Sequence, residues 1–106
     1  MGEVNTFWIL WRYDRIGYLY DDGVSMVIYK YTIDATEQEF NIPLIKILDF
    51  QIQNNAIVFW AVVDDHRPKS NFSIKMIWTG QEPPIGYSYK KTIQDDEGLV
   101  WHIFMR

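Results

Sequence analysis

Hydrophobic residues recur at every second position along most of this chain. This period is typical of β-strands, because successive side chains of a strand point to opposite faces of the sheet. The run at 56–63 differs, since all of its residues are hydrophobic, and it predicts a central strand that is buried on both faces. Together these patterns predict strands at 26–33, 44–53, 56–63, 72–79, 87–93 and 99–105.

The alternation also assigns side chains to the faces of the predicted strands. Asn54 and Asn55 predict a tight turn between two strands, because asparagine tolerates positive φ. Glycines and prolines at 80–86 predict a loop that cannot be the interior of a strand. The residues expected to share one face are Val27, Tyr29, Tyr31 and Ile33 in the first strand, and Leu44, Leu48, Phe50 and Ile52 in the next.

Two segments have less regular patterns. Residues 7–20 predict a hairpin, with a short helix as the alternative. Residues 35–40 allow one helical turn, for which Asp34 or Thr36 would supply the N-cap. We therefore expect an all-β fold with at most one short helix, an antiparallel sandwich or small barrel of seven or eight strands.

Composition and charge narrow the class of protein. The 106 residues fit a single domain, in which residues 1–25 are an N-terminal extension or an added hairpin. The absence of cysteine excludes disulfides and thiolate metal sites, and the net charge of −4 disfavours direct binding to nucleic acid. The apolar stretch Phe7–Trp11 is far shorter than the roughly 20 residues of a membrane span, so we expect a cytoplasmic protein that contacts no membrane.

Five short motifs follow one another along residues 26–106: Tyr29–Ile33, Asn41–Pro43, Phe59–Asp64, Trp78–Gly80 and Leu99–Phe104. In this order they resemble a family of short, uncharacterised bacteriophage proteins. Thr32 and Trp78 depart from the residues usual in that family, and residues 1–25 lie outside the match. The resemblance implies no assigned activity. It implies a small accessory protein of a phage that acts in the cytoplasm of the host cell.

Few residues suggest catalysis. Asp64, Asp65 and His66 are the only cluster suited to a metal or to acid–base chemistry. Neighbouring residues of a strand point to opposite faces, so an ordinary solvated turn is the favoured interpretation. None of the three serines lies in a G-x-S-x-G motif. We therefore predict no metal site, no cofactor and no enzymatic activity.

Aromatic residues provide the strongest indication of binding. Five tryptophans and seven tyrosines exceed what a core of this size readily buries, although a thick aromatic core is the alternative. Tyrosine and tryptophan are favoured at interfaces, because one end of each side chain is apolar and the other forms hydrogen bonds. The candidate binding residues are Tyr87 and Tyr89, Thr79 and Gly80 beside the long loop, His102, Arg67, and, near the N-terminus, Tyr18 and Tyr20.

Two of these candidates also have purely structural interpretations. For His102 the favoured interpretation is a structural histidine that is hydrogen-bonded to a neighbouring strand or loop, and for Gly80 it is a role in the geometry of its turn.

These observations favour stoichiometric binding, with inhibition of a host or anti-phage defence protein as the expected role. The alternative is a homo-oligomer that sequesters a nucleotide-like molecule. Tyrosine and tryptophan rings would then stack on the base, while Arg67, Lys69 or Lys90 would meet a phosphate. A virion or scaffold component is a third interpretation.

Overall fold

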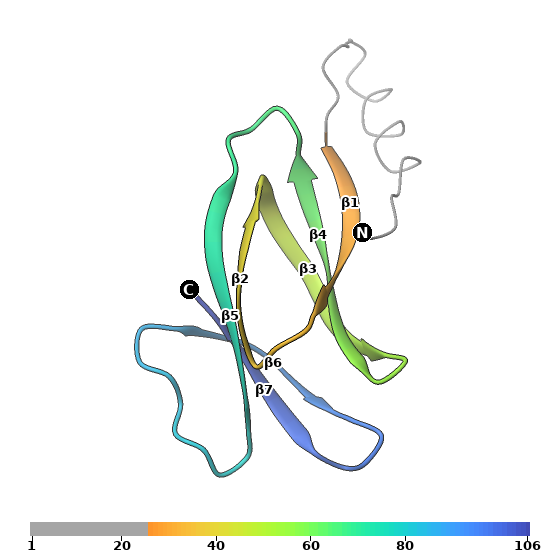
Figure 1. Cartoon of the computed structure of the whole chain (residues 1–106), viewed down its shortest axis with the longest axis vertical. Coiled ribbons are helices and arrows are strands. Elements are labelled where there is room, and N and C mark those ends of the chain that lie inside the picture. Colours follow the sequence, from red (N-terminus) through yellow and green to blue (C-terminus); the bar gives the residue numbers. More distant parts are fainter. Residues whose placement is uncertain (1–25) are drawn as a thin grey trace.

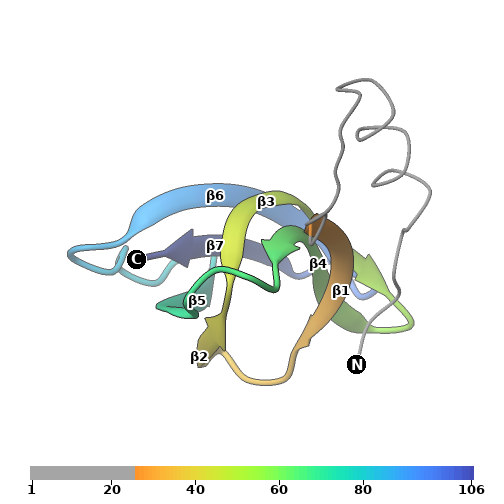
Figure 2. The same cartoon turned by 90° about the horizontal axis from the view of Figure 1, so that it is seen from above.

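The computed structural model describes residues 26–106, which form seven strands in two antiparallel sheets (Figure 1). The three-stranded sheet has the order β1-β4-β3 and the four-stranded sheet the order β2-β5-β7-β6. The all-β antiparallel prediction is confirmed, and the arrangement is sandwich-like (Figure 2). The hairpin predicted at 7–20 lies outside the described residues. The strands are β1 (Met26–Ile33), β2 (Glu37–Ile42), β3 (Leu44–Gln53), β4 (Ala56–Asp64), β5 (Ser70–Trp78), β6 (Ser88–Gln94) and β7 (Val100–Met105).

Aromatic rings from both sheets fill the space between them. Phe59 on β4 has no exposed surface, and its ring centroid lies 5.3 Å from that of Tyr31 on β1 and 5.7 Å from that of Phe50 on β3. From the four-stranded sheet, Phe40 meets Phe59 edge to face at 5.1 Å and stacks on Phe72 at 5.4 Å. Phe59 therefore joins the two layers of the sandwich.

Strand β4 is the centre of the three-stranded sheet, as its continuous hydrophobic run predicts. Phe59, Ala61 and Val63 belong to the core cluster between the sheets. Val58 and Val62 point to the opposite face and are also buried, with 3% and 6% of their surface exposed. The prediction of a strand buried on both faces is confirmed.

The helical turn allowed at 35–40 is wrong, because this part of the chain is in strand β2. Gln38 and Phe40 lie opposite Ile74 and Phe72 of β5, and the buried Phe40 ring joins the core. Neither Asp34 nor Thr36 caps a helix. The Thr36 carbonyl accepts a hydrogen bond from the amide of Met76 at 2.7 Å. The described residues contain no helix, and thus none that is long and apolar enough to cross a membrane.

The predicted face of β3 is partly wrong. Leu44, Phe50 and Ile52 pack in or against the core, but Leu48 is 45% exposed, and Ile47 packs against the core in its place. The pairing of β3 with β4 is irregular between Leu44 and Lys46 and again between Ile47 and Asp49. Each irregularity shifts the phase of the alternation, as a β-bulge does.

Two short connections and an ion pair hold the strands of the sandwich in place: a turn joins β3 to β4, one residue joins β2 to β3, and the ion pair links β3 to β6. Gln53 pairs with Ala56, and Asn54 and Asn55 between them have φ of 53° and 65°, which confirms the predicted tight turn. Pro43 alone separates β2 from β3 and carries the chain from one sheet to the other. At the edge where β6 approaches β3, Lys91 Nζ donates to Asp49 Oδ1 at 2.5 Å, and this bond lowers the pKa of Asp49.

Candidate functional site

The face of the four-stranded sheet that points away from the core, here called the outer face, brings several predicted binding residues together. On β7, Trp101, Ile103 and Met105 pack in or against the core, so the intervening His102 and Phe104 lie on the outer face. In the pairing of β6 with β7, Thr92 lies opposite His102 and Tyr89 opposite Phe104.

Hydrogen bonds link four side chains of the outer face into a row. Thr79 Oγ1 lies 2.9 Å from His102 Nε2, and His102 Nδ1 lies 3.0 Å from Thr92 Oγ1. The Thr92 hydroxyl lies 2.7 Å from the hydroxyl of Tyr89. Each ring nitrogen of His102 thus has one threonine hydroxyl as its partner, and a hydroxyl can either donate or accept, so it suits the nitrogen in both roles. Both ring nitrogens are engaged, as in the structural-histidine interpretation.

Aromatic side chains surround this row. Tyr89 is 57% exposed, and its ring meets that of Phe104 edge to face at 5.8 Å. Tyr87 reaches across the sheet, where its hydroxyl donates to Glu37 Oε2 on β2 at 3.3 Å. The guanidinium of Arg106 lies 4.9 Å above the Tyr87 ring. We call the set of Thr79, Tyr87, Tyr89, Thr92, His102 and Phe104 the aromatic row.

Two of the predicted binding residues, Arg67 and Gly80, are not members of the aromatic row. Arg67 lies in the exposed turn that follows β4, at the opposite end of β5 from Thr79. The nine residues of β5 span about 30 Å, so Arg67 is not part of the aromatic row. Gly80 follows Thr79 and has φ of 106°, a conformation that favours glycine, with open space where a side chain would project. Tyr18 and Tyr20 lie outside the described residues.

The acidic segment after β4 forms a turn. Asp64 Oδ1 accepts a hydrogen bond from the amide of His66 at 2.9 Å, and the amide of Arg67 donates to the Asp64 carbonyl at the same distance. Asp65 and His66 are exposed. Among residues 26–106, no group of three or more histidine, cysteine or acidic side chains is placed to hold a metal ion.

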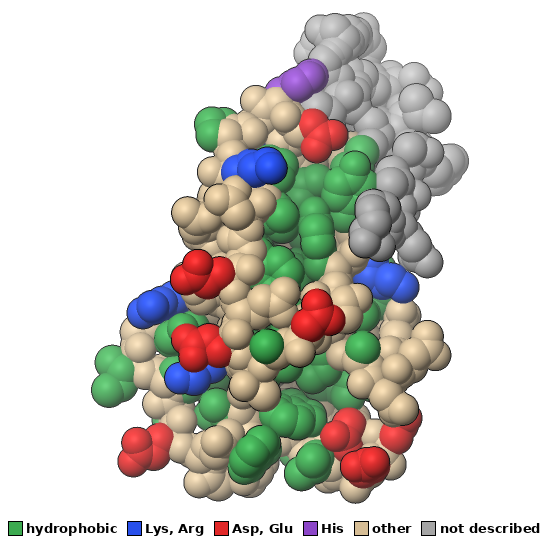
Figure 3. Space-filling model, viewed as in Figure 1, with side chains coloured by type: hydrophobic (Ala, Val, Ile, Leu, Met, Phe, Trp, Pro, Cys, Tyr) green, Lys and Arg blue, Asp and Glu red, His purple; other side chains and the backbone are tan. Residues whose placement is uncertain are grey.

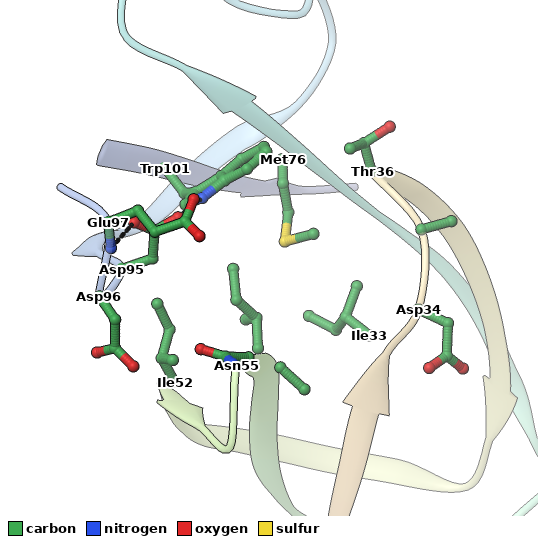
Figure 4. Close-up of a pocket in the computed structure, with 13 residues that line it drawn as sticks. Ile33, Asp34, Thr36, Ile52, Asn55, Met76, Asp95, Asp96, Glu97 and Trp101 are labelled. Carbon is green, nitrogen blue, oxygen red and sulfur yellow. Dashed lines mark hydrogen bonds between the residues drawn. The ribbon is translucent and has the colours of Figure 1, made fainter. Parts of the chain in front are cut away.

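A cavity of about 630 Å³ opens at one end of the sandwich (Figure 4). We call it the end pocket. Three connections meet there: the β1–β2 link, the β3–β4 turn and the β6–β7 turn. Ile33, Ile52, Ile57, Met76 and Trp101 line its apolar floor.

Acidic residues rim the end pocket. Asp95, Asp96 and Glu97 gather on one side of it and Asp34 on the other (Figure 4). Figure 3 shows acidic side chains clustered at this lower end of the molecule, beside exposed hydrophobic groups. No lysine, arginine or histidine is among the described residues that line the pocket. The run of three acidic residues is visible in the sequence, but its position across one cavity from Asp34 is not.

Asp95 holds the β6–β7 turn and orients Trp101. Its Oδ1 accepts hydrogen bonds from the amides of Glu97 and Leu99, both at 2.9 Å, and its Oδ2 accepts one from Trp101 Nε1 at 3.1 Å. Desolvation opposes ionisation of Asp95. The hydrogen bonds from Trp101 and from backbone amides of the turn outweigh it, so the pKa of Asp95 lies below its ordinary value.

This pKa predicts a pH-dependent contribution to stability. Because the folded state lowers the pKa of Asp95, its contribution is present above the unfolded-state pKa of about 4 and is lost as the pH falls further. Asp95→Asn removes the charge and places an amide donor either against the indole of Trp101 or against the backbone amides of Glu97 and Leu99. Urea unfolding of this variant should therefore depend less on pH between about pH 5 and pH 2 than that of the unchanged protein. Equal pH dependence in the two proteins would contradict the role of Asp95.

Comparison with protein-family models matches residues 25–106 to a domain of unknown function, DUF7352. No curated protein matches the chain, and no solved structure matches it. The matched segment begins one residue before β1 and includes all seven strands. Its extent agrees with that of the uncharacterised family indicated by the sequence motifs. The chain therefore belongs to the DUF7352 family.

Proposed function

We propose that this protein is a phage accessory protein that binds a protein partner stoichiometrically and inhibits it, the partner being a host or anti-phage defence protein. The aromatic row on the outer face is the observation that carries the proposal. The order of the sequence motifs supports the phage origin.

The aromatic row has the properties of a preorganised protein-binding surface. Hydrogen bonds fix the side chains of Thr79, His102 and Thr92 and reach the hydroxyl of the exposed Tyr89. Side chains that are fixed before binding lose less conformational entropy when a partner docks. Tyrosine is also enriched among the residues that dominate the affinity of protein interfaces.

The charge of the end pocket argues against binding of a nucleotide-like molecule there. The acidic rim of the end pocket would repel a phosphate group. Lys69 and Arg67 follow β4, whereas the pocket includes Ala56 at the start of β4, so these cations lie at the other end of the strand.

Expression with bacterial defence systems tests the proposal. Cells that carry one defence system each would produce this protein, and plaque formation by a phage sensitive to that system would be measured. Native mass spectrometry of the gently purified protein would then report its partner. We expect restored plaque formation with one system and a complex of fixed stoichiometry with a component of it. Restoration without any complex would contradict stoichiometric binding, and so would a complex with a nucleotide alone.

A further inference from the structure

We propose that the end pocket binds an arginine or lysine side chain presented by a peptide segment of a protein partner. The inference concerns a surface separate from the aromatic row and does not rest on it. The two surfaces lie on opposite faces of β7, because Trp101 points into the pocket and His102 to the outer face.

The lining of the end pocket matches a long basic side chain in both polarity and charge. Its volume of about 630 Å³ is within the range of about 300–1,000 Å³ that is usual for ligand sites. Ile33, Ile57 and Met76 offer an apolar floor for the methylene stem of arginine or lysine. The cationic head would remain at the rim, among the acidic residues.

The rim carboxylates are available for such a cation. None of the carboxylates of Asp34, Asp96 and Glu97 pairs with another described side chain, in contrast to that of Asp95. Guanidinium groups form paired hydrogen bonds with carboxylates and stack on aromatic rings, and Trp101 lines the same cavity. Arginine therefore fits better than lysine.

Exposed apolar groups beside the pocket favour a peptide over a free small cation. The ring of Trp78 meets that of Trp101 edge to face at 5.5 Å, and Trp78 remains 45% exposed. Leu99, two residues before Trp101 in the chain, is 46% exposed. A peptide with apolar residues next to its arginine would cover both side chains, whereas a polyamine would leave them in water.

An NMR titration with two matched peptides tests the proposal. The probes are the acetylated and amidated peptide Gly-Leu-Arg-Leu-Gly and the same peptide with citrulline, which is close to arginine in shape but carries no charge. We expect the arginine peptide to bind about tenfold more tightly and to shift the signals of the Trp101 indole and the Met76 methyl group. Its affinity should fall as salt is added. Equal affinity for the two peptides, or shifts confined to the outer face, would overturn the proposal.

Two triple variants separate the pocket from general electrostatics. Asp34→Asn, Asp96→Asn and Glu97→Gln together neutralise the rim and should weaken binding of the arginine peptide about tenfold. The control variant neutralises three acidic residues that do not line the pocket and therefore has the same net charge. Its affinity should stay within about twofold of the unchanged protein; an equal loss would overturn the proposal. The control substitutions are Glu39→Gln, Asp65→Asn and Glu82→Gln.

Other occupants of the pocket give different results. Spermidine that binds as tightly as the peptide, and shifts the same signals, would assign the pocket to a free polyamine and overturn the proposal. If the protein self-associates and the rim variant does not, the occupant of the pocket is a second copy of this chain. That result would also overturn the proposal. Tyr89→Ala should bind the arginine peptide like the unchanged protein, so failure of this inference and failure of the proposed function remain distinguishable.

Discussion

Replacing Phe59 with alanine is expected to lower the free energy of unfolding by about 3–5 kcal/mol. The Phe59 ring has no exposed surface and contacts rings from both sheets, so its removal leaves a cavity that neither sheet can fill alone. Small domains are stabilised by only about 5–15 kcal/mol in total. Urea unfolding, followed by tryptophan fluorescence, would measure the loss.

Phe59→Leu is the matched control for this prediction. Leucine keeps most of the buried apolar volume but loses the edge-to-face contact with Phe40 and the stacking on Tyr31. It should therefore cost much less stability than alanine at the same position. If Phe59→Ala cost less than about 1 kcal/mol, the ring could not be the centre of a shared core.

Removing the aromatic side chains of Tyr89 and Phe104 together is expected to weaken binding of the protein partner about 100-fold. Tyr89 is mostly exposed and its ring lies against that of Phe104, so the pair presents one apolar surface on the outer face. Neither residue belongs to the core cluster, and the double alanine variant should remain folded. Binding to the purified partner would be measured by calorimetry, with a thermal melt to confirm folding.

Ile45→Ala with Leu48→Ala is the control for the outer-face variant. These two side chains are also exposed, at 36% and 45%, but they belong to strand β3 of the other sheet. The control variant should bind the partner as the unchanged protein does. Full binding by the outer-face variant, or an equal loss in both variants, would contradict the assignment of the interface to the aromatic row.

Alternation of hydrophobic residues predicted most of the fold because most strands bury one face. The predicted face of strand β1 packs in or against the core, and within the predicted run of β4 all residues except Ala56 and Trp60 are buried. Strand β2 was missed because its polar residues, such as Glu37 and Glu39, lie on the outer face of an edge strand and leave few apolar positions to reveal the period. The phase of β3 was missed at Leu48, because the irregular pairing with β4 depends on the neighbouring strand.

The candidate sites depend on contacts between segments that are distant in the sequence. Thr79 and His102 were separate candidates in the sequence and Thr92 was not among them, but the pairing of β5, β7 and β6 places all three in one row. Arg67 was grouped with them by residue type alone. The end pocket was not predicted, because Asp34 and Asp96 become neighbours of one cavity only when the two sheets pack together.

Hydrogen–deuterium exchange of the protein alone and in complex with its partner tests the proposed interface most directly. Strand β6 is an edge strand of the four-stranded sheet, so some of its amides exchange readily until a partner covers them. Binding through the aromatic row predicts slower exchange in β6 and in the loop at 79–87 that precedes it. Slower exchange confined to the three-stranded sheet, with β6 and this loop unchanged, would contradict the account.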